Sequence, residues 1–182
     1  MMIPVRRATL ADAARLADFA AKTFHDAFAV DNDPRDFALH VSRCFGVDQQ
    51  LAELANPGIV TLLAERDGDL IAYAQLRRGA PPPSITTLAD AQPMEVWRFY
   101  VSKDWHGSGI ARFLMATVEM EAERRAANAL WLGVWERNAR AMAFYRKCGF
   151  EVSGTQAFVL GTNPQTDIVM TRRLAGQPAA RT

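Results

Sequence analysis

The sequence has few cysteines and no excess of either charge. Only Cys44 and Cys148 occur among 182 residues, too few for a disulfide framework or a structural zinc site. The 21 Lys and Arg residues are balanced by 20 Asp and Glu residues, which leaves a formal net charge of +1. A balanced chain lacks the basic surface that holds a nucleic-acid backbone or an anionic membrane. We therefore expect no metal, and neither a nucleic acid nor a membrane as partner.

Long hydrophobic runs are also missing. The longer apolar stretches, such as Ile59–Ala64, have the length of a strand and are far too short to span a bilayer. Near the start of the chain, Arg6 and Arg7 follow a short apolar patch, which reverses the charge order of a secretory signal. These absences predict a cytoplasmic protein.

The composition that remains is that of a globular protein, with 49% hydrophobic and 23% charged residues. A chain of this length suits one domain with its own core. We expect a single domain over residues 1–174. The small and polar residues 175–182 are expected to form a flexible tail.

The period of the apolar residues separates helices from strands. It predicts helices over 9–29, 34–45, 48–56, 110–127 and 138–148, and strands over 5–8, 59–66, 70–77, 94–101, 129–135, 150–160 and 167–174. In the fourth helix, Ile110, Phe113, Leu114 and Val118 share one face. The proline-containing segment 79–93 is expected to be an open surface loop. Because both a strand–helix–strand unit and hairpins occur, the predicted sheet is mixed, with parallel and antiparallel neighbours.

One segment has the residue types of an anion site. Gly107 and Gly109 follow a predicted strand and directly precede a predicted helix. Glycines let backbone N–H groups approach a bulky anion, and a helix N-terminus supplies partial positive charge and unpaired donors. A plain glycine turn that only starts a helix is the alternative. Neither a Walker sequence nor a dinucleotide-binding arrangement fits the position of these glycines.

Two motifs resemble those of the GNAT superfamily of acyl-CoA-dependent N-acyltransferases. The run His106-Gly107-Ser108-Gly109-Ile110-Ala111 is similar to its phosphate motif Gln/Arg-x-x-Gly-x-Gly/Ala, with His106 in place of the first residue. The run from Asn138 to Phe150 is similar to the family's Asn-x-x-Ala-x-x-Phe-Tyr-x-x-x-Gly-Phe helix. Further similarity at Trp131–Glu136, Phe158–Gly161 and Gln165–Asp167 resembles the PaiA-like branch, whose members acetylate spermidine and spermine.

The resemblance implies an α/β (α+β) fold with a mixed, mostly antiparallel sheet of six to seven strands. A central parallel pair would splay apart, with about four to five helices around the sheet. It implies acetyl-CoA as co-substrate and acetyl transfer to a primary amine of a small molecule, polyamines first, by direct attack in a ternary complex. Protein N-terminal or lysine acetylation is an alternative, as is a non-catalytic acyl-CoA-binding module. The branch resemblance also allows a homodimer.

The resemblance also assigns roles to residues. Backbone groups of Phe99, Tyr100 and Val101 would bind the pantetheine arm, and the Val101 N–H would stabilise the developing oxyanion. Tyr145 would protonate the departing thiolate; the alternative is an aromatic that fills the helix–sheet seam. The complete cofactor set expected is Phe99, Tyr100, Val101, Gly107, Ser108, Gly109, Ile110, Ala111, Arg112, Asn138 and Tyr145.

An amine acceptor arrives protonated and needs a base. Glu95 is the candidate catalytic carboxylate and Glu136 a second one, although either would also suit a plain strand end. An acidic cluster in the sequence would attract a polycation, unless these residues serve as caps and turns. The cluster consists of Asp26, Asp31, Asp33 and Asp36. Cys148 and the residues Trp105, Trp131 and Trp135 are expected to pack in the core or along its seams.

Overall fold

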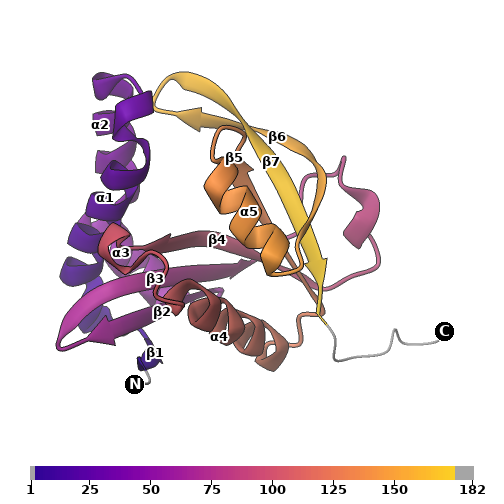
Figure 1. The fold of residues 1–182 in the computed structure, drawn as a ribbon, viewed down its shortest axis with the longest axis horizontal. Coiled ribbons are helices and arrows are strands. Elements are labelled where there is room, and N and C mark those ends of the chain that lie inside the picture. The colour runs from indigo at the N-terminus through magenta and orange to yellow at the C-terminus, as the bar shows by residue number, and fades with distance from the viewer. Residues whose placement is uncertain (1–2, 175–182) are drawn as a thin grey trace.

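The structure, a computed structural model, describes residues 3–174. The expected tail over 175–182 lies outside the described residues. Residues 3–174 contain seven strands and five α-helices (Figure 1). In chain order these are β1 (Val5–Arg7), α1 (Ala13–Phe28), α2 (Pro34–Cys44), α3 (Val47–Ala55), β2 (Ile59–Arg66), β3 (Asp69–Arg78), β4 (Pro93–Val101), α4 (Ile110–Arg124), β5 (Ala129–Trp135), α5 (Ala139–Lys147), β6 (Glu151–Leu160) and β7 (Asn163–Arg173).

All seven strands form one sheet in the order β1-β2-β3-β4-β5-β7-β6. The pair β4–β5 is parallel, and every other pair is antiparallel. The parallel pair is joined through α4, as a strand–helix–strand unit requires. The mixed fold expected from the sequence is confirmed.

The two parallel strands separate after a short paired stretch. Only Pro93–Glu95 of β4 pair with β5, opposite Ala129–Trp131. Between β3 and β4 the register shifts, because Gln75 pairs with Arg98 whereas Leu76 pairs with Val96. The extra residue is Trp97, and a bulge of this kind bends a strand. The splayed central pair is therefore present, with a gap between the carboxyl ends of β4 and β5.

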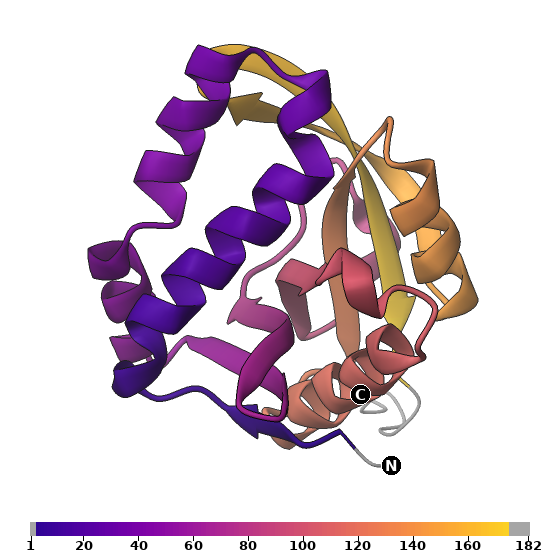
Figure 2. The ribbon, with the colours of Figure 1, turned by 60° about the vertical axis from the view of Figure 1, so that its left-hand side comes forward.

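Helices cover both faces of the sheet. On one face, α4 and α5 close the largest apolar cluster, in which Leu114, Val118 and Tyr145 pack with Leu130 and Leu132. On the other face, α1 and α2 bury a second cluster of aromatic and aliphatic side chains. Figure 2 shows α1 and α2 side by side and apart from α4 and α5. The gap between β4 and β5 connects these two faces.

One local expectation is wrong, and another needs a refinement. Phe113 on α4 is 44% exposed, because the buried stripe of this helix follows Ile110, Leu114 and Val118 and leaves Phe113 at its edge. The segment 79–93 lies at the surface as expected, but it is anchored there because Ile85 and Leu88 are buried against Ala129, Trp131 and Val169.

The last hairpin is longer than expected. Strand β7 begins at Asn163 rather than at residue 167, and a turn at Gly161 and Thr162 joins it to β6. Pro164 is tolerated because this end of β7 pairs only with β6, while pairing with β5 stops at Asp167. Gln165 and Asp167 therefore lie on a strand that extends past the end of β5.

Candidate active site

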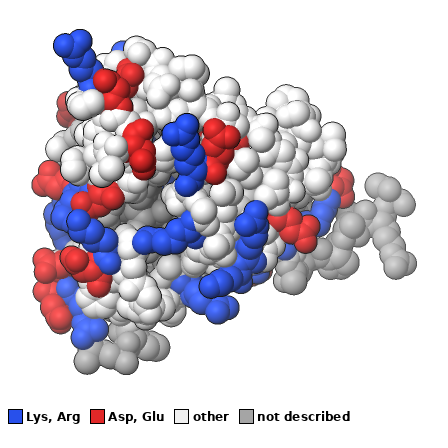
Figure 3. Space-filling model, turned by 45° about the horizontal axis from the view of Figure 1, so that its top comes forward, with Lys and Arg blue, Asp and Glu red and all other residues white. Residues whose placement is uncertain are grey.

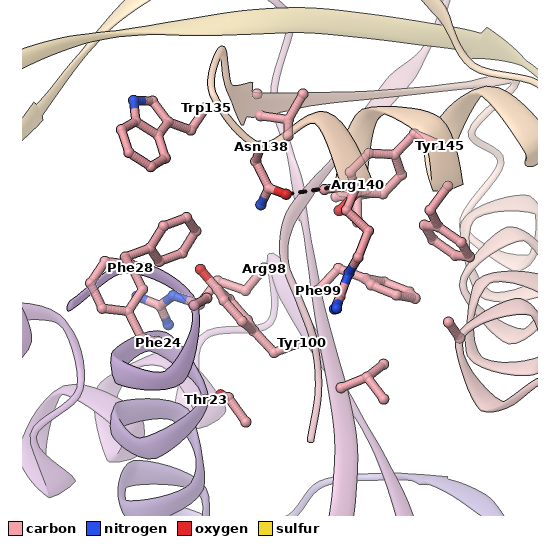
Figure 4. Close-up of a pocket in the computed structure, with 18 of the residues that line it drawn as sticks. Thr23, Phe24, Phe28, Arg98, Phe99, Tyr100, Trp135, Asn138, Arg140 and Tyr145 are labelled. Carbon is pink, nitrogen blue, oxygen red and sulfur yellow. Dashed lines mark hydrogen bonds between the residues drawn. The ribbon is translucent and has the colours of Figure 1, made fainter. Parts of the chain in front are cut away.

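A cavity of about 1080 Å³ occupies the gap between β4 and β5. Its walls come from α1, β4, the loop before α4, β5, α5, β6 and β7. Figure 4 shows two groups of side chains in it: Phe24, Phe28 and Trp135 on one side, and Tyr145 with Arg140 on the other. A cavity of this size in a split sheet suits an extended ligand that passes from one face to the other.

Backbone groups of β4 are exposed in the gap. The Ser102 N–H donates to the Ile71 carbonyl at 2.9 Å, which directs the polar groups of every second residue of β4 toward β3. Alternation turns the N–H and C=O of Phe99 and Val101 toward the gap, where β5 is no longer paired. The backbone groups of Tyr100 face β3 instead, and its side chain lines the cavity.

The glycine loop borders the same cavity. Gly107 and Gly109 have φ angles of +81° and +89°, which side-chain-bearing residues rarely adopt. No other group lies within 4 Å of the position a Cβ would take at either residue, so the space above the loop is open. Within the described chain, the amides of both glycines lack a backbone hydrogen-bond partner. An open loop with free amides at the start of α4 fits a phosphate group.

The remaining residues of the expected phosphate run have other surroundings. Ala111 lines the cavity, but Ser108 and Arg112 do not. The Ser108 hydroxyl donates to the Trp105 carbonyl at 2.7 Å, and Ile110 is buried in the core. Gly107, Gly109 and Ala111 are thus the members of this run that border the cavity.

His106 and Arg140 meet across the mouth of the cavity. His106 Nε2 lies 3.1 Å from the Val101 carbonyl and 2.9 Å from an Arg140 guanidinium nitrogen. One tautomer donates to the carbonyl and the other accepts from the guanidinium, so Nε2 satisfies one of these contacts at a time. Arg140 could not be singled out from the sequence, because its position in the helix motif is unspecified. Its charge lies beside the glycine loop.

Asn138 and Tyr145 both line the cavity, Asn138 as the N-cap of α5 and Tyr145 from its last turn. Asn138 Oδ1 accepts the Ala141 N–H at 3.1 Å, so Asn138 caps the helix as expected. Tyr145 is 8% exposed and lies among Phe99, Phe144 and Phe150. Burial raises the pKa of Tyr145 above its ordinary value, so its hydroxyl keeps its proton at neutral pH.

The two expected bases have different surroundings. Glu95 is buried, lines the cavity and forms an ion pair with Arg77. Arg77 also stacks on Trp97, with its guanidinium carbon 4.2 Å from the ring centroid. Glu136 is exposed beyond the end of β5 and is not part of the cavity wall. Of the two, only Glu95 borders the site, and it already has a cationic partner.

The wall opposite α5 is aromatic. Phe28 lies 6.0 Å from Trp135 and 6.5 Å from Tyr100 between ring centroids, and 4.8 Å from Phe24. Trp135 therefore forms part of the cavity wall, whereas Trp131 is buried, and its indole N–H donates to the Gly79 carbonyl. We call the space between α1, β5 and β7 the aromatic chamber.

One carboxylate in the aromatic chamber was not singled out as a candidate site residue. Asp167 on β7 pairs in register with Trp135 and Gln156, lines the cavity and is 9% exposed. Burial raises its pKa to about 6, and a hydrogen bond from Gln156 partly opposes that increase. The only sequence signal was the branch resemblance at Gln165–Asp167, which specifies no role.

The acidic cluster is largely engaged in structural contacts. Asp26 is paired with Lys22 at 3.0 Å and with Lys103 at 3.3 Å. Asp33 caps α2, and Asp36 accepts hydrogen bonds from the backbone and hydroxyl of Thr162 at 2.6 and 2.7 Å. These contacts match the cap and turn alternative for Asp33 and Asp36.

The link between Asp36 and Thr162 lies next to the end of the aromatic chamber that Leu160 and Gln165 line. It joins α2 to the turn between β6 and β7, and Gln165 Nε2 donates to Asn32 Oδ1 at 2.5 Å beside it. Figure 1 shows this contact at the top of the molecule, where the tip of the hairpin meets α2. We call this link between α2 and the tip of the β6–β7 hairpin the roof of the aromatic chamber.

The described residues show neither a metal-binding cluster nor a membrane-spanning helix. Among residues 3–174, no group of three or more His, Cys, Asp or Glu side chains is placed to hold a metal ion. No helix in this part of the chain has the length and apolar character needed to cross a membrane. The surface in Figure 3 carries side chains of both signs around a central hollow.

Comparison with known proteins gives one family. A family model described as the acetyltransferase (GNAT) family matches residues 20–150. A Mycobacterium tuberculosis protein named an uncharacterized N-acetyltransferase is 34% identical over 91% of this chain and 99% of its own length. A Stenotrophomonas maltophilia aminoglycoside N(6')-acetyltransferase is 29% identical over 81% of this chain and 85% of its own. A Bacillus subtilis subsp. natto protein named "Probable spermine N(1)-acetyltransferase" is 28% identical over 50% of this chain and 59% of its own.

Solved structures share the fold. A PaiA N-acetyltransferase from Thermoplasma acidophilum in complex with coenzyme A has a TM-score of 0.77 and 21% identity, covering 95% of this chain and 99% of its own. A Salmonella typhimurium structure determined with its cofactor acetyl-CoA has a TM-score of 0.72 and 20% identity, covering 100% and 99%. The split sheet around the cavity is thus the fold of chains crystallised with this coenzyme.

Proposed function

Because the chain belongs to the GNAT family of acetyltransferases and is an acetyl-CoA-dependent N-acetyltransferase, we propose that it acetylates a primary amine of a small molecule by direct attack in a ternary complex. The observation that carries this proposal is the single cavity that connects the glycine loop, the Tyr145 hydroxyl and the aromatic chamber. Such a cavity allows both substrates to meet without a covalent enzyme intermediate.

The residues present fit the coenzyme. The amides of Gly107 and Gly109 and the N-terminus of α4 would hold its pyrophosphate, and Arg140 adds positive charge beside them. The gap-facing backbone groups of Phe99 and Val101 would bind the pantetheine arm as a further strand. When bound, acetyl-CoA supplies the activated acetyl thioester. The Val101 N–H would stabilise negative charge that develops on the carbonyl oxygen.

Tyr145 would act as the general acid. Its hydroxyl lines the cavity on the α5 side, and burial keeps it protonated. A thiolate that leaves the thioester is a strong enough base to draw a proton from a positioned phenol as the bond breaks. This role gives the hydroxyl a function, whereas packing in the helix–sheet seam requires only the ring.

The roof over the chamber favours a small acceptor over a folded protein. Asp36 and Thr162 bring α2 and the β6–β7 turn together above the space that a protein segment would have to cross. Polyamines are the first acceptors to test, since a relative named for spermine acetylation covers half of this chain. Aminoglycosides are the second class, because a relative of greater coverage bears that name.

The test is a panel of polyamines, aminoglycosides, simple alkylamines and peptides, with acetylated products identified by mass spectrometry and acetyl-CoA binding measured by calorimetry. We expect acetyl-CoA binding and turnover of small amines, with turnover lost in Tyr145→Phe. Binding of acetyl-CoA without turnover of any amine would favour a non-catalytic acyl-CoA-binding module. Turnover of peptides alone would favour protein acetylation.

A further inference from the structure

Three carboxylates line the cavity, and their partners differ. Asp26 is paired with Lys22 and Lys103, and Glu95 is paired with Arg77. Among the described residues, Asp167 forms no ion pair. A carboxylate that is 9% exposed and lacks a cationic partner is costly to keep ionised, so it is rarely placed in a cavity without a role.

The surroundings of Asp167 are built to present it to the cavity. A Cβ on Gly133 would lie 2.9 Å from Asp167 Oδ2 and 2.5 Å from Gln156 Nε2, so only glycine at this place on β5 leaves room for both. The Gln156 amide lies beside the carboxylate and partly offsets the effect of burial on the Asp167 pKa. Trp135 stands opposite Asp167 in the β5–β7 ladder and forms the adjoining wall.

The aromatic side chains are a second feature of the chamber that favours binding of a cation. Figure 4 shows Trp135, Phe28 and Tyr100 around the same part of the cavity, with Tyr145 on the opposite side. Aromatic faces attract a cation within about 6 Å, and this attraction strengthens where water is excluded. An ammonium group between these rings and Asp167 would have both a counterion and a π surface, whereas an anion or a neutral polar group would have neither.

We propose that Asp167 binds the ammonium group of the acceptor in the aromatic chamber and takes its proton before attack. This inference rests on the proposed function and names the base and the cationic acceptor class of that site: an alkylammonium whose remaining part lies along aromatic walls. Glu95 then has a structural role, because it is paired with Arg77. Since Asp26 is paired with Lys103, Asp167 is the one cavity carboxylate among residues 3–174 without an ion pair.

The proton balance of the step is complete. An N–H bond of the ammonium breaks and its proton moves to Asp167, which leaves a neutral amine. The nitrogen forms a bond to the acetyl carbon, and the carbon–sulfur bond breaks. Tyr145 gives its proton to the departing sulfur and regains one from the acylated nitrogen. Asp167 releases its proton to solvent, so each turnover yields the amide, the thiol and one proton.

None of the charged and titratable groups around Asp167 forms an ion pair with it that would explain its burial by a structural role. Tyr100, on β4, lines the same cavity; burial raises its pKa, and the nearby negative charge of Asp167 adds to that increase. On β6 the neighbour is the neutral Gln156, and on β5 it is Trp135. Of the other charged side chains in the cavity wall, Arg77 is paired with Glu95, Arg98 with Glu53 and Lys103 with Asp26. Arg140 meets His106 near the glycine loop, and Lys147 lies at the C-terminal end of α5. Outside the wall, the Arg137 guanidinium carbon lies 5.7 Å from the Trp135 ring centroid.

The experiment compares Asp167→Asn with two other variants. Asp90→Asn removes an exposed carboxylate that pairs with Arg173 outside the cavity and serves as the charge control. Gly133→Ala keeps the carboxylate but displaces it. For each protein we would measure calorimetric binding of acetyl-CoA, calorimetric binding of 1,4-diaminobutane and hexylamine in the presence of CoA, and kcat/KM from pH 5 to 9.

We expect wild type and Asp90→Asn to bind alkylamines and to show kcat/KM that rises with pH through about 6, as Asp167 ionises. In Asp167→Asn, acetyl-CoA affinity should be retained while kcat/KM for alkylamines falls about 100-fold or more and the limb near pH 6 disappears. The kcat/KM for aniline, whose amine is already neutral, should fall far less in this variant. Gly133→Ala should resemble Asp167→Asn.

Two results would overturn the assignment, and they are distinguishable. If Asp167→Asn keeps the alkylamine affinity and the limb near pH 6 while wild type turns over amines, Asp167 is not the base although the proposed function stands. If wild type binds acetyl-CoA but neither binds nor acetylates any amine, the proposed function fails, and the role of Asp167 fails with it.

Discussion

Arg98 on β4 donates to Glu53 on α3 at 2.5 Å and to Gln75 on β3 at 2.6 Å, in a region that solvent hardly reaches. The Arg98 guanidinium also stacks on Trp97, the extra residue of the β4 bulge, with its carbon 4.0 Å from the ring centroid. The Arg98–Glu53 contact therefore holds α3 against β4, the strand that bends away from β5 and forms part of the cavity wall.

Breaking this pair should destabilise the protein. In Glu53→Gln, the Arg98 charge stays buried without a counterion, and we expect the free energy of unfolding to fall by about 3 to 5 kcal/mol. Denaturant unfolding measures the loss. Lys22→Met, which removes one exposed partner of Asp26, should leave the unfolding midpoint nearly unchanged. Equal losses of stability in the two variants would show that the buried ion pair contributes no more to the free energy of unfolding than the exposed one.

The glycine loop can be tested with a matched glycine elsewhere. Gly109 and Gly68 have nearly the same φ, +89° and +90°, and both have open space around the Cβ position. Alanine at either site should cost roughly 1 to 2 kcal/mol through the left-handed backbone. Only Gly109→Ala should weaken acetyl-CoA binding, by about tenfold or more. Calorimetry measures both proteins, and equal affinities would exclude the loop as the phosphate site.

Tyr145→Phe separates chemistry from binding. The substitution removes a proton donor but keeps the ring that packs against Phe99 and Phe150. We expect kcat to fall by about 100-fold or more while the acetyl-CoA dissociation constant and the melting temperature change little. Steady-state kinetics and calorimetry measure this difference. A loss of coenzyme binding equal to the loss of kcat would assign Tyr145 to packing or to the cofactor.

The roof over the aromatic chamber should control acceptor size. A Cβ at Gly161 would lie 2.5 Å from the Asp36 backbone, so Gly161→Ala should push α2 away from the β6–β7 turn. We expect KM for small alkylamines to rise and turnover of bulky amines or peptides to increase relative to wild type. The acceptor panel measures both changes. An unchanged ratio of bulky to small acceptors would show that the roof does not select acceptors.

Asp167 should reduce stability as the pH rises. Its folded-state pKa of about 6 lies above its unfolded value, so the folded state binds more protons between these values and stability falls as pH rises through that interval. Asp167→Asn should therefore raise the unfolding free energy above pH 6, by at most about 3 kcal/mol, although it lowers activity. Thermal unfolding at pH 4 and pH 8 measures this. A gain that is equal at both pH values would contradict it.

Much of the fold follows from local patterns in the sequence. The change from helical to strand period marks nearly every element, because the buried face of each helix or strand repeats within the element itself. The glycine loop and the α5 motif are also contiguous runs, so His106–Ala111 and Asn138–Phe150 pointed to a coenzyme site and the parallel pair β4–β5 before any packing was known.

The acceptor side of the site depended on the tertiary structure. The register of β7 places Asp167 beside Trp135 of β5 and Gln156 of β6. Arg98 pairs with Glu53 on α3, which lies 45 residues away in the chain. Residue identity alone did not distinguish Glu95, held by Arg77, from Asp167, which has no ion pair among the described residues. The local sequence determines which groups are present and which element carries them. Long-range packing decides which carboxylates are neutralised and which remain open to a substrate, because burial and charge pairing are properties of contacts between distant segments.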